Sequence, residues 1–112
     1  MKRPGDVRSV EIAVGEKDGA WVIAVKGEVD LSTSPDLRSA LLKTIAGTAS
    51  TVAVDLRSVS YMDSSGVATL IEGLQACHRK KGKLVVLAPS KQVRNVLELT
   101  RLDSVFEIRE SL

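Results

Sequence analysis

The sequence has few of the residues on which most protein chemistry depends. Among its 112 residues are one cysteine, one histidine and 3% aromatic residues. Without a second cysteine, Cys77 can form neither an internal disulfide nor a cysteine metal site, which fits a reducing, cytoplasmic environment. We interpret it as a small apolar residue on a buried helix face. We predict a cytoplasmic protein without metal or cofactor, whose core is mostly Val, Leu, Ile and Ala.

Long apolar runs and a strong net charge are missing too. No stretch reaches the roughly 18 apolar residues of a membrane span, and the charged N-terminus has no apolar core of a signal peptide, so we expect no membrane insertion. Sixteen basic and fourteen acidic residues give a net charge of +2. This charge is too small to steer the protein toward nucleic acid, and the tract "HRKKGK", residues 78 to 83, is interpreted as a solvated helix end.

An enzyme is not expected either. A serine nucleophile needs a base, and the one histidine, His78, lies about 14 residues along the helix that Ser64 begins, or about 20 Å away. The sequence has no G-x-S-x-G elbow, no G-x-x-x-x-G-K-[ST] phosphate loop and no His/Cys cluster for a transition metal. We therefore predict a binding protein.

The chain does contain a regular alternation of apolar segments, which we interpret as one α/β domain. After an initial hairpin with a loop of about five residues, "GEKDG", strands alternate with helices, which predicts a mixed sheet with central parallel strands. The predicted order is β-β-α-β-α-β-α-β. The elements are strands at 9–14 and 20–26, a helix at 34–46, a strand at 51–56, a helix from Asp63 to about Lys81 that stops at Gly82, a strand at 83–88, a helix within 90–102 and a strand at 104–108.

Apolar spacing predicts which faces are buried. The run Val52, Ala53, Val54 is typical of a central strand covered on both faces, and each helix has one apolar stripe. Residues 1–8 are expected to be loosely held. The stripes are Leu37, Leu41, Thr44 and Ile45 in the first helix, Val67, Leu70, Ile71, Leu74 and Cys77 in the second, and Val93, Val96, Leu97 and Thr100 in the third.

The motif "MDSSG", residues 62 to 66, stands where a strand gives way to a helix. Asp63 suits the N-cap, but Gly66 in the first turn costs about 1 kcal/mol relative to alanine. We interpret Gly66 as a bare turn that lets a partner's backbone approach the hydroxyls of Ser64 and Ser65. A phosphate there would add roughly −1.5 to −2 charges, which a helix N-terminus tolerates and a docked protein does not. The motif thus predicts a switch that breaks binding without unfolding the domain.

A second polar stretch, "GEVDLSTSPDL", also connects a strand to a helix. It carries Asp30, Ser32, Thr33 and Ser34, and the alternation of elements predicts that it lies at the same end of the sheet as Asp63. An ordinary polar loop with a Ser or Thr N-cap before Pro35 explains these residues about as well.

Three segments together, "GEVDLSTSPDL", "VAVDLRSVSYMDSSGVATL" and "VRNVLELTRLDSVFEI", resemble the STAS domain family, and within it the bacterial anti-sigma factor antagonists. The resemblance runs from about residue 9 to 109 and implies one domain over 9–112, with helices on one face of the sheet. It implies that the unphosphorylated protein binds an anti-sigma factor that is also a serine kinase. That kinase uses its own ATP to phosphorylate a serine of this protein, and the phosphorylated protein releases the kinase. A phosphatase then removes the phosphate.

The same resemblance assigns residues. The acceptor that matches is Ser64, with Ser65 as runner-up; partner contacts are Asp63, Ser65, Gly66 and Val67, and the neighbouring wall is Asp30 with Ser32, Thr33 and Ser34. Antagonists usually read G-L-G after the serines, whereas this chain reads G-V-A. That variant also occurs in STAS subunits of lipid-trafficking ABC transporters and in signalling scaffolds. The alternative is therefore a constitutive subunit that binds an ABC transporter ATPase.

Overall fold

The computed structural model describes residues 9–112, so the prediction for residues 1–8 lies outside the described part of the chain. The predicted order of elements is confirmed. The elements are β1 (Val10–Lys17), β2 (Ala20–Val29), α1 (Ser34–Ile45), β3 (Thr51–Met62), α2 (Ser64–Arg79), β4 (Lys83–Leu87), α3 (Lys91–Leu99) and β5 (Glu107–Arg109).

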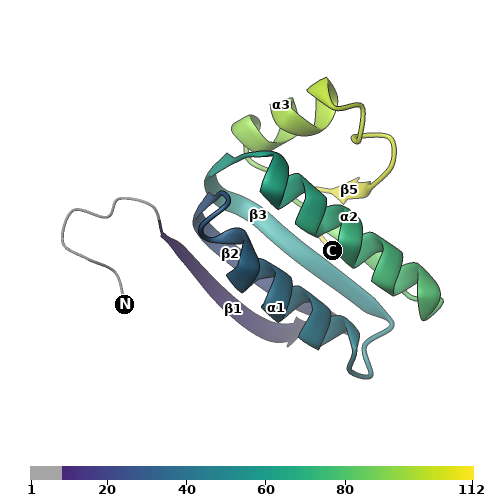
Figure 1. Cartoon of the computed structure of the whole chain (residues 1–112). Coiled ribbons are helices and arrows are strands. Elements are labelled where there is room, and N and C mark those ends of the chain that lie inside the picture. Colours follow the sequence, from purple (N-terminus) through teal and green to yellow (C-terminus); the bar gives the residue numbers. More distant parts are fainter. Residues whose placement is uncertain (1–8) are drawn as a thin grey trace.

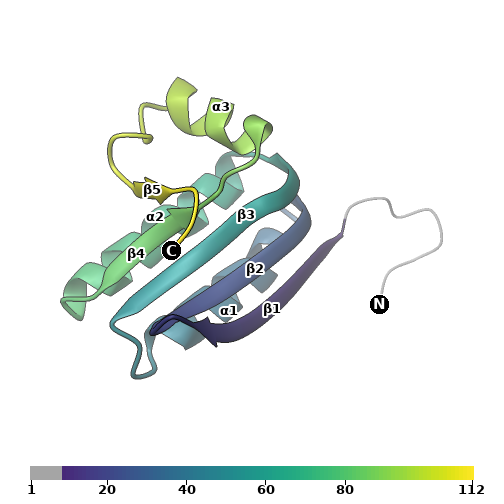
Figure 2. The same ribbon diagram turned by 180° about the vertical axis from the view of Figure 1, so that it is seen from behind.

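The sheet is mixed and centrally parallel, as predicted. Its strands lie in the order β1-β2-β3-β4-β5; β1 runs antiparallel to β2, and the other neighbours are parallel. Figure 1 shows α1 and α2 side by side over one face, and Figure 2 shows the opposite face without a helix over the long strands. The third helix, α3, packs beside the end of β3.

The core lies between the sheet and these helices. Val52 and Val54 face it, and Ala53 belongs to a smaller cluster with Val85 and Leu87 on the other face. The central strand is therefore buried on both sides, as predicted, but the C-terminal Leu112 packs against the second face in place of a helix. The predicted helix stripes are buried or half-buried, except for Thr100, which is exposed at the end of α3 because the helix stops there.

The hairpin between β1 and β2 is tighter than the sequence predicted. Residues 15 to 17 continue the strand, and the turn consists of Asp18 and Gly19, whose φ angles are 53° and 82°. Two consecutive positive φ angles form the turn whose twist matches the flanking strands, and Asp-Gly is a favoured pair for it. The predicted five-residue loop was therefore wrong.

The end of β3 and the start of β5 also differ from the prediction, and hydrogen bonds explain both differences. β3 continues six residues past its predicted end, with β2 as its neighbour up to the pair Val29 and Met62. The last strand starts at Glu107 instead of 104, because the N–H groups of Val105 and Phe106 donate to the carbonyl of Leu102 at 3.0 and 3.2 Å in a turn. That turn directs Phe106 into the core.

Helix α2 ends two residues earlier than predicted. Lys81, with φ of 59°, takes the left-handed conformation that usually falls to glycine, and the N–H of Gly82 donates to the carbonyl of Cys77 at 2.8 Å. Gly82 has a different reason to be glycine. A Cβ there would lie 3.0 Å from the carbonyl oxygen of Ser50, which accepts the N–H of Lys83.

Candidate functional site

Two strand-to-helix junctions meet at one end of the sheet, as the sequence predicted. The first junction, residues 30 to 33, follows β2, and the second junction, residues 63 to 66, follows β3. Val29 and Met62 are paired at the ends of these strands, and the N–H of Asp63 donates to the carbonyl of Val29 at 3.1 Å. The two polar loops are therefore neighbours on one surface.

In the first junction, Asp30 organises the loop. Its side chain is only 1% exposed, and Oδ1 accepts the hydroxyl of Ser32 at 2.7 Å, the N–H of Ser32 at 2.9 Å and the N–H of Thr33 at 3.1 Å. These hydrogen bonds, the Ser32 hydroxyl first, outweigh the effect of burial and lower the pKa of Asp30 from 3.8 to about 2. The carboxylate is therefore charged throughout the neutral range.

Thr33 completes this loop without capping the helix. It occupies the N-cap position of α1, yet its side chain caps no helix N–H. Its hydroxyl instead donates to the carbonyl of Glu28 at 2.7 Å and accepts the N–H of Asp30 at 2.9 Å. The hydroxyl thus ties the loop back to β2, which is a different role from the N-cap that the sequence suggested.

In the second junction, Asp63 is the N-cap of α2, as predicted. Its Oδ1 accepts the N–H of Ser65 at 2.9 Å and the hydroxyl of Ser65 at 2.5 Å. Ser65 is half-buried and its hydroxyl is hydrogen-bonded, whereas Ser64, the first residue of α2, is exposed. The Ser64 hydroxyl makes no hydrogen bond within residues 9–112.

The two junctions share an Asp-x-Ser arrangement that turns its middle residue outward. In the first junction that residue is Leu31, which is 80% exposed, and in the second it is Ser64. Leu31 was not among the predicted site residues, which are the polar residues around it. An apolar side chain inside a polar loop was the signal that could have found it.

The structure shows a different reason for glycine at position 66 from the one that the sequence suggested. Gly66 is buried, and a Cβ there would lie 2.6 Å from Cγ of Met62 and 2.8 Å from Cγ1 of Val29. Glycine is needed so that the first turn of α2 can pack on the ends of β2 and β3. Its bare backbone faces the protein's own core, so a partner's backbone has no access along that side.

Gln92, on α3, is a supporting residue that the sequence did not reveal. Its side-chain oxygen accepts the N–H of Met62 at 2.8 Å, and its side-chain nitrogen donates to the carbonyl of Met62 at 3.1 Å. The register between β3 and β4 stops at Asp55 and Leu87, so Met62 has no β4 residue beside it. The Gln92 amide therefore replaces a strand neighbour and fixes the peptide just before Asp63.

The structure brings all the predicted site residues to this end of the sheet, but to different depths. Those on the outside can meet a partner, and those inside can only position the others. Ser32 and Ser64 are exposed, Asp63 and Ser65 are half-buried, and Asp30, Thr33, Ser34, Gly66 and Val67 are buried.

The described residues offer few other chemical features. Burial raises the pKa of the Cys77 thiol, which agrees with its predicted role as a core residue. Within residues 9–112, no three His, Cys, Asp or Glu side chains are grouped as a metal site would need. None of the helices in this part of the chain has the length and apolarity to cross a membrane.

Comparison with known proteins agrees with the fold. A curated anti-sigma-B factor antagonist of Listeria monocytogenes is 28% identical over 102 residues, which are 90% of this chain and 90% of that protein. A crystal structure of an anti-sigma factor antagonist from Mycobacterium paratuberculosis is 31% identical, with a TM-score of 0.79 over 93% of this chain and 88% of that one.

A third similar protein, SpoIIAA of Bacillus, is an anti-sigma factor antagonist solved in two states. Its unphosphorylated form has a TM-score of 0.74 at 24% identity over 88% of this chain and 87% of that one, and its phosphorylated form has 0.68 at 23% over 88% and 90%. A model of the STAS domain matches residues 11–112. The chain therefore belongs to the STAS domain family and is similar, over most of its length, to members that are anti-sigma factor antagonists.

Proposed function

We propose that this chain binds an anti-sigma factor that is also a serine kinase, and that phosphorylation of Ser64 releases it. The proposal rests on the hydroxyl of Ser64, which is exposed and makes no hydrogen bond within residues 9–112. Ser65 is the weaker acceptor because its hydroxyl already donates to Asp63 at 2.5 Å. In the transfer, Oγ of Ser64 attacks the γ-phosphorus of the kinase's ATP, ADP leaves, and a base on the kinase takes the hydroxyl proton.

The site tolerates a phosphate in the free protein. Ser64 is the first residue of α2, where the positive end of the helix dipole favours an anion. The side chain points outward and supports no contact of the fold. SpoIIAA, which has the same fold, has been solved in both its unphosphorylated and its phosphorylated form. Phosphorylation should therefore leave the domain folded.

A bound partner would not tolerate that phosphate. A surface docked over Ser64 would have to bury a dianion beside the Asp63 carboxylate, and every 1.4 kcal/mol of penalty weakens binding tenfold. Release by phosphorylation follows from this charge alone. A phosphatase that removes the phosphate restores binding.

The contact surface follows from the exposed side chains at the two junctions. Leu31 supplies an exposed apolar side chain at the same end of the sheet as the exposed Ser32 and Ser64, and Tyr61, 40% exposed, lies near the end of β3. Tyrosine is among the residues that most often dominate the binding energy of an interface, and an exposed leucine adds apolar area that a partner can bury. The buried residues of the two junctions hold Leu31, Ser32 and Ser64 in place.

No observation on residues 9–112 supports the transporter alternative, which was predicted from the G-V-A variant. Val67 is buried in the core, so its difference from the more usual leucine concerns packing under α2. Ala68 is exposed one residue further along the helix and is the part of the variant that a partner could meet. In a transporter subunit, Ser64→Asp should leave the complex with the ABC ATPase intact.

The proposal is tested by mapping the phosphate. The protein, its Ser64→Ala variant and its Ser65→Ala variant are each incubated with ATP and the anti-sigma factor kinases encoded in the same genome. We expect labelling of the protein and of Ser65→Ala, and none of Ser64→Ala, by mass spectrometry. Labelling that persists in Ser64→Ala, or no labelling by any of these kinases, contradicts the assignment.

A further inference from the structure

The two edges of the sheet are unequal. One edge is β5, with three residues, and the other is β1, with eight. Long edge strands offer a row of backbone groups to another chain unless proline, charged side chains, a bulge or a covering segment protects them. β1 contains no proline, its register with β2 is unbroken, and its central Val14 is 46% exposed.

The backbone groups that face outward along β1 can be identified. The N–H of Glu28 donates to the carbonyl of Ser9 at 2.8 Å, so Ser9 directs its backbone toward β2. The pairing then continues without a shift from Val10 with Gly27 to Lys17 with Ala20. Because alternate residues of an antiparallel strand point their N–H and C=O groups to opposite sides, the groups of residues 10, 12, 14 and 16 point away from the sheet.

We propose that a second copy of this chain docks along β1, antiparallel, with the two-fold axis at Val14. Only registers that place even-numbered residues opposite even-numbered ones let the outward groups of both copies pair. With the axis at Val14, that residue lies opposite its own copy and Ile12 lies opposite Glu16. The two sheets then form one continuous sheet.

Charge selects this register. With the axis at Val14, Glu11 of each copy lies opposite Lys17 of the other, so the contact has two ion pairs; both residues are exposed in the single chain. The next allowed register, with the axis at Ala13, places Lys17 opposite Ser9 and Glu11 opposite Gly15, and has no such pair. Opposite charges directly across two strands stabilise the pairing.

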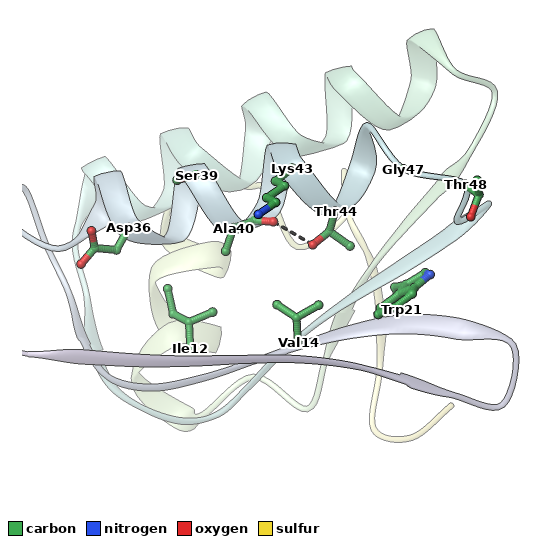
Figure 3. A pocket seen from close by; sticks show the side chains of 10 residues that line it. All are labelled: Ile12, Val14, Trp21, Asp36, Ser39, Ala40, Lys43, Thr44, Gly47 and Thr48. Carbon is green, nitrogen blue, oxygen red and sulfur yellow. Dashed lines mark hydrogen bonds between the residues drawn. The ribbon is translucent and has the colours of Figure 1, made fainter.

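The apolar face of β1 supports the same partner. Figure 3 shows Ile12 and Val14 pointing from β1 toward α1, and with Trp21 they line a cavity of about 740 Å³ between the strand and the helix. A two-fold axis perpendicular to the sheet places α1 of both copies on the same face. Val14 of each copy then lies beside Val14 of the other, with Ile12 of one copy opposite Glu16 of the other on either side.

Such a dimer leaves the site at the two junctions free. The first junction begins at Asp30, beyond the last β1 pair at Gly27, and the axis lies at Val14. Because the two β1 strands are antiparallel, the two sites point in opposite directions. Each copy can then hold its own partner, so this inference does not depend on the proposed function.

Cysteine cross-linking tests the contact and its register in the full chain. Residues directly opposite in a hydrogen-bonded pair have Cα atoms about 5.5 Å apart, within disulfide range. Val14→Cys should therefore form a covalent dimer of twice 12.0 kDa under mild oxidation. The matched variant Ala13→Cys should not, because the two Ala13 positions would lie diagonally, about 8 Å apart.

Charge reversal tests the same contact without a cross-link. Sedimentation equilibrium should show a monomer–dimer equilibrium that Lys17→Glu weakens by about tenfold, since two attractive pairs become two repulsive ones. Glu11→Lys should weaken it similarly, and the double variant should restore it. A monomer at all concentrations, cross-linking of Ala13→Cys in place of Val14→Cys, or no restoration in the double variant overturns the proposal.

Discussion

The two strand-to-helix junctions at the end of the sheet that carries the candidate site use the same four-residue arrangement and differ in the residues at two of its positions. In each, an aspartate Oδ1 accepts both the N–H and the hydroxyl of the serine two residues later. The differences lie in the second and fourth positions. The first junction has Leu31 and Thr33 there, and the second has Ser64 and Gly66.

These differences give the two junctions different roles. Thr33 adds side-chain hydrogen bonds around a buried aspartate, which makes the first junction a fixed support for an apolar contact. Gly66 lets the second junction pack closely on Met62, which leaves Asp63 and Ser64 near the surface. The first junction therefore supplies shape, and the second presents a group that can be modified.

Removing the two aspartates should show this difference most strongly. Asp30→Ala leaves the buried N–H of Thr33 and the part-buried N–H of Ser32 without their acceptor, and we expect it to lower the free energy of unfolding by about 3 kcal/mol. Asp63→Ala removes an N-cap and should lower it by about 1 kcal/mol. Urea unfolding of both variants measures the two values; an equal or reversed order contradicts the comparison.

Acid should act through the same aspartate. The folded pKa of Asp30 is lowered to about 2 from 3.8, so its contribution to stability is complete above about pH 4 and is lost as the pH falls through about 2. The stability difference between the protein and Asp30→Asn should therefore narrow between pH 4 and pH 2. A difference that stays constant over this interval would show that the charge of Asp30 is not what holds the loop.

The next largest effect on stability is expected at the fourth position of the second junction, Gly66. Gly66→Ala places a Cβ 2.6 Å from Met62 and 2.8 Å from Val29, which should cost about 2 kcal/mol of stability. Gly15→Ala is a matched control because nothing lies within 4 Å of the added Cβ, and it should change stability by less than about 0.5 kcal/mol. Similar melting temperatures for the two variants would show that the close packing is not needed.

The second position of the first junction should affect binding and leave stability unchanged. Leu31→Ser should weaken binding of the anti-sigma factor by about tenfold, or about 1.4 kcal/mol, because an exposed apolar contact is lost. Leu99→Ser, on a side chain 84% exposed at the end of α3, is the control and should bind normally. Isothermal titration calorimetry compares them, and equal affinities would remove Leu31 from the interface.

The smallest effect is expected at the support of the second junction. Gln92→Ala removes two hydrogen bonds to the backbone of Met62 and should lower stability by about 1 kcal/mol. Asn95→Ala, an exposed change on the same helix, should have little effect. Hydrogen exchange should also be faster at the Met62 amide in Gln92→Ala, and unchanged exchange there would contradict the assigned role.

The sequence predicted what depends on local pattern. Helical spacing located the core face of α2, and Asp63 before Ser64 and Ser65 indicated a capped helix start, which the hydrogen bonds of Asp63 confirm. Alternation of strands and helices placed the two polar loops at one end of the sheet. These inferences needed only neighbouring residues and the rules of chain connection.

The sequence failed where distant residues decide. Gly66 is explained by Met62 and Val29, and Gln92 acts on Met62 from a helix about thirty residues away, which no local pattern reveals. The depth of each site residue was also hidden, since Asp30 and Ser32 lie in the same polar loop yet one is buried and the other exposed. Tertiary packing supplies these distinctions.

The central claim is that a phosphate on Ser64 breaks binding and leaves the fold intact. Homogeneously phosphorylated protein, with its phosphate position mapped, should be measured for both affinity to the anti-sigma factor and thermal unfolding. We predict affinity at least about a hundredfold lower, or about 2.7 kcal/mol, with a melting temperature within a few degrees of the unmodified protein. Unchanged affinity of the Ser64-phosphorylated protein, or unfolding caused by the phosphate, would contradict the account.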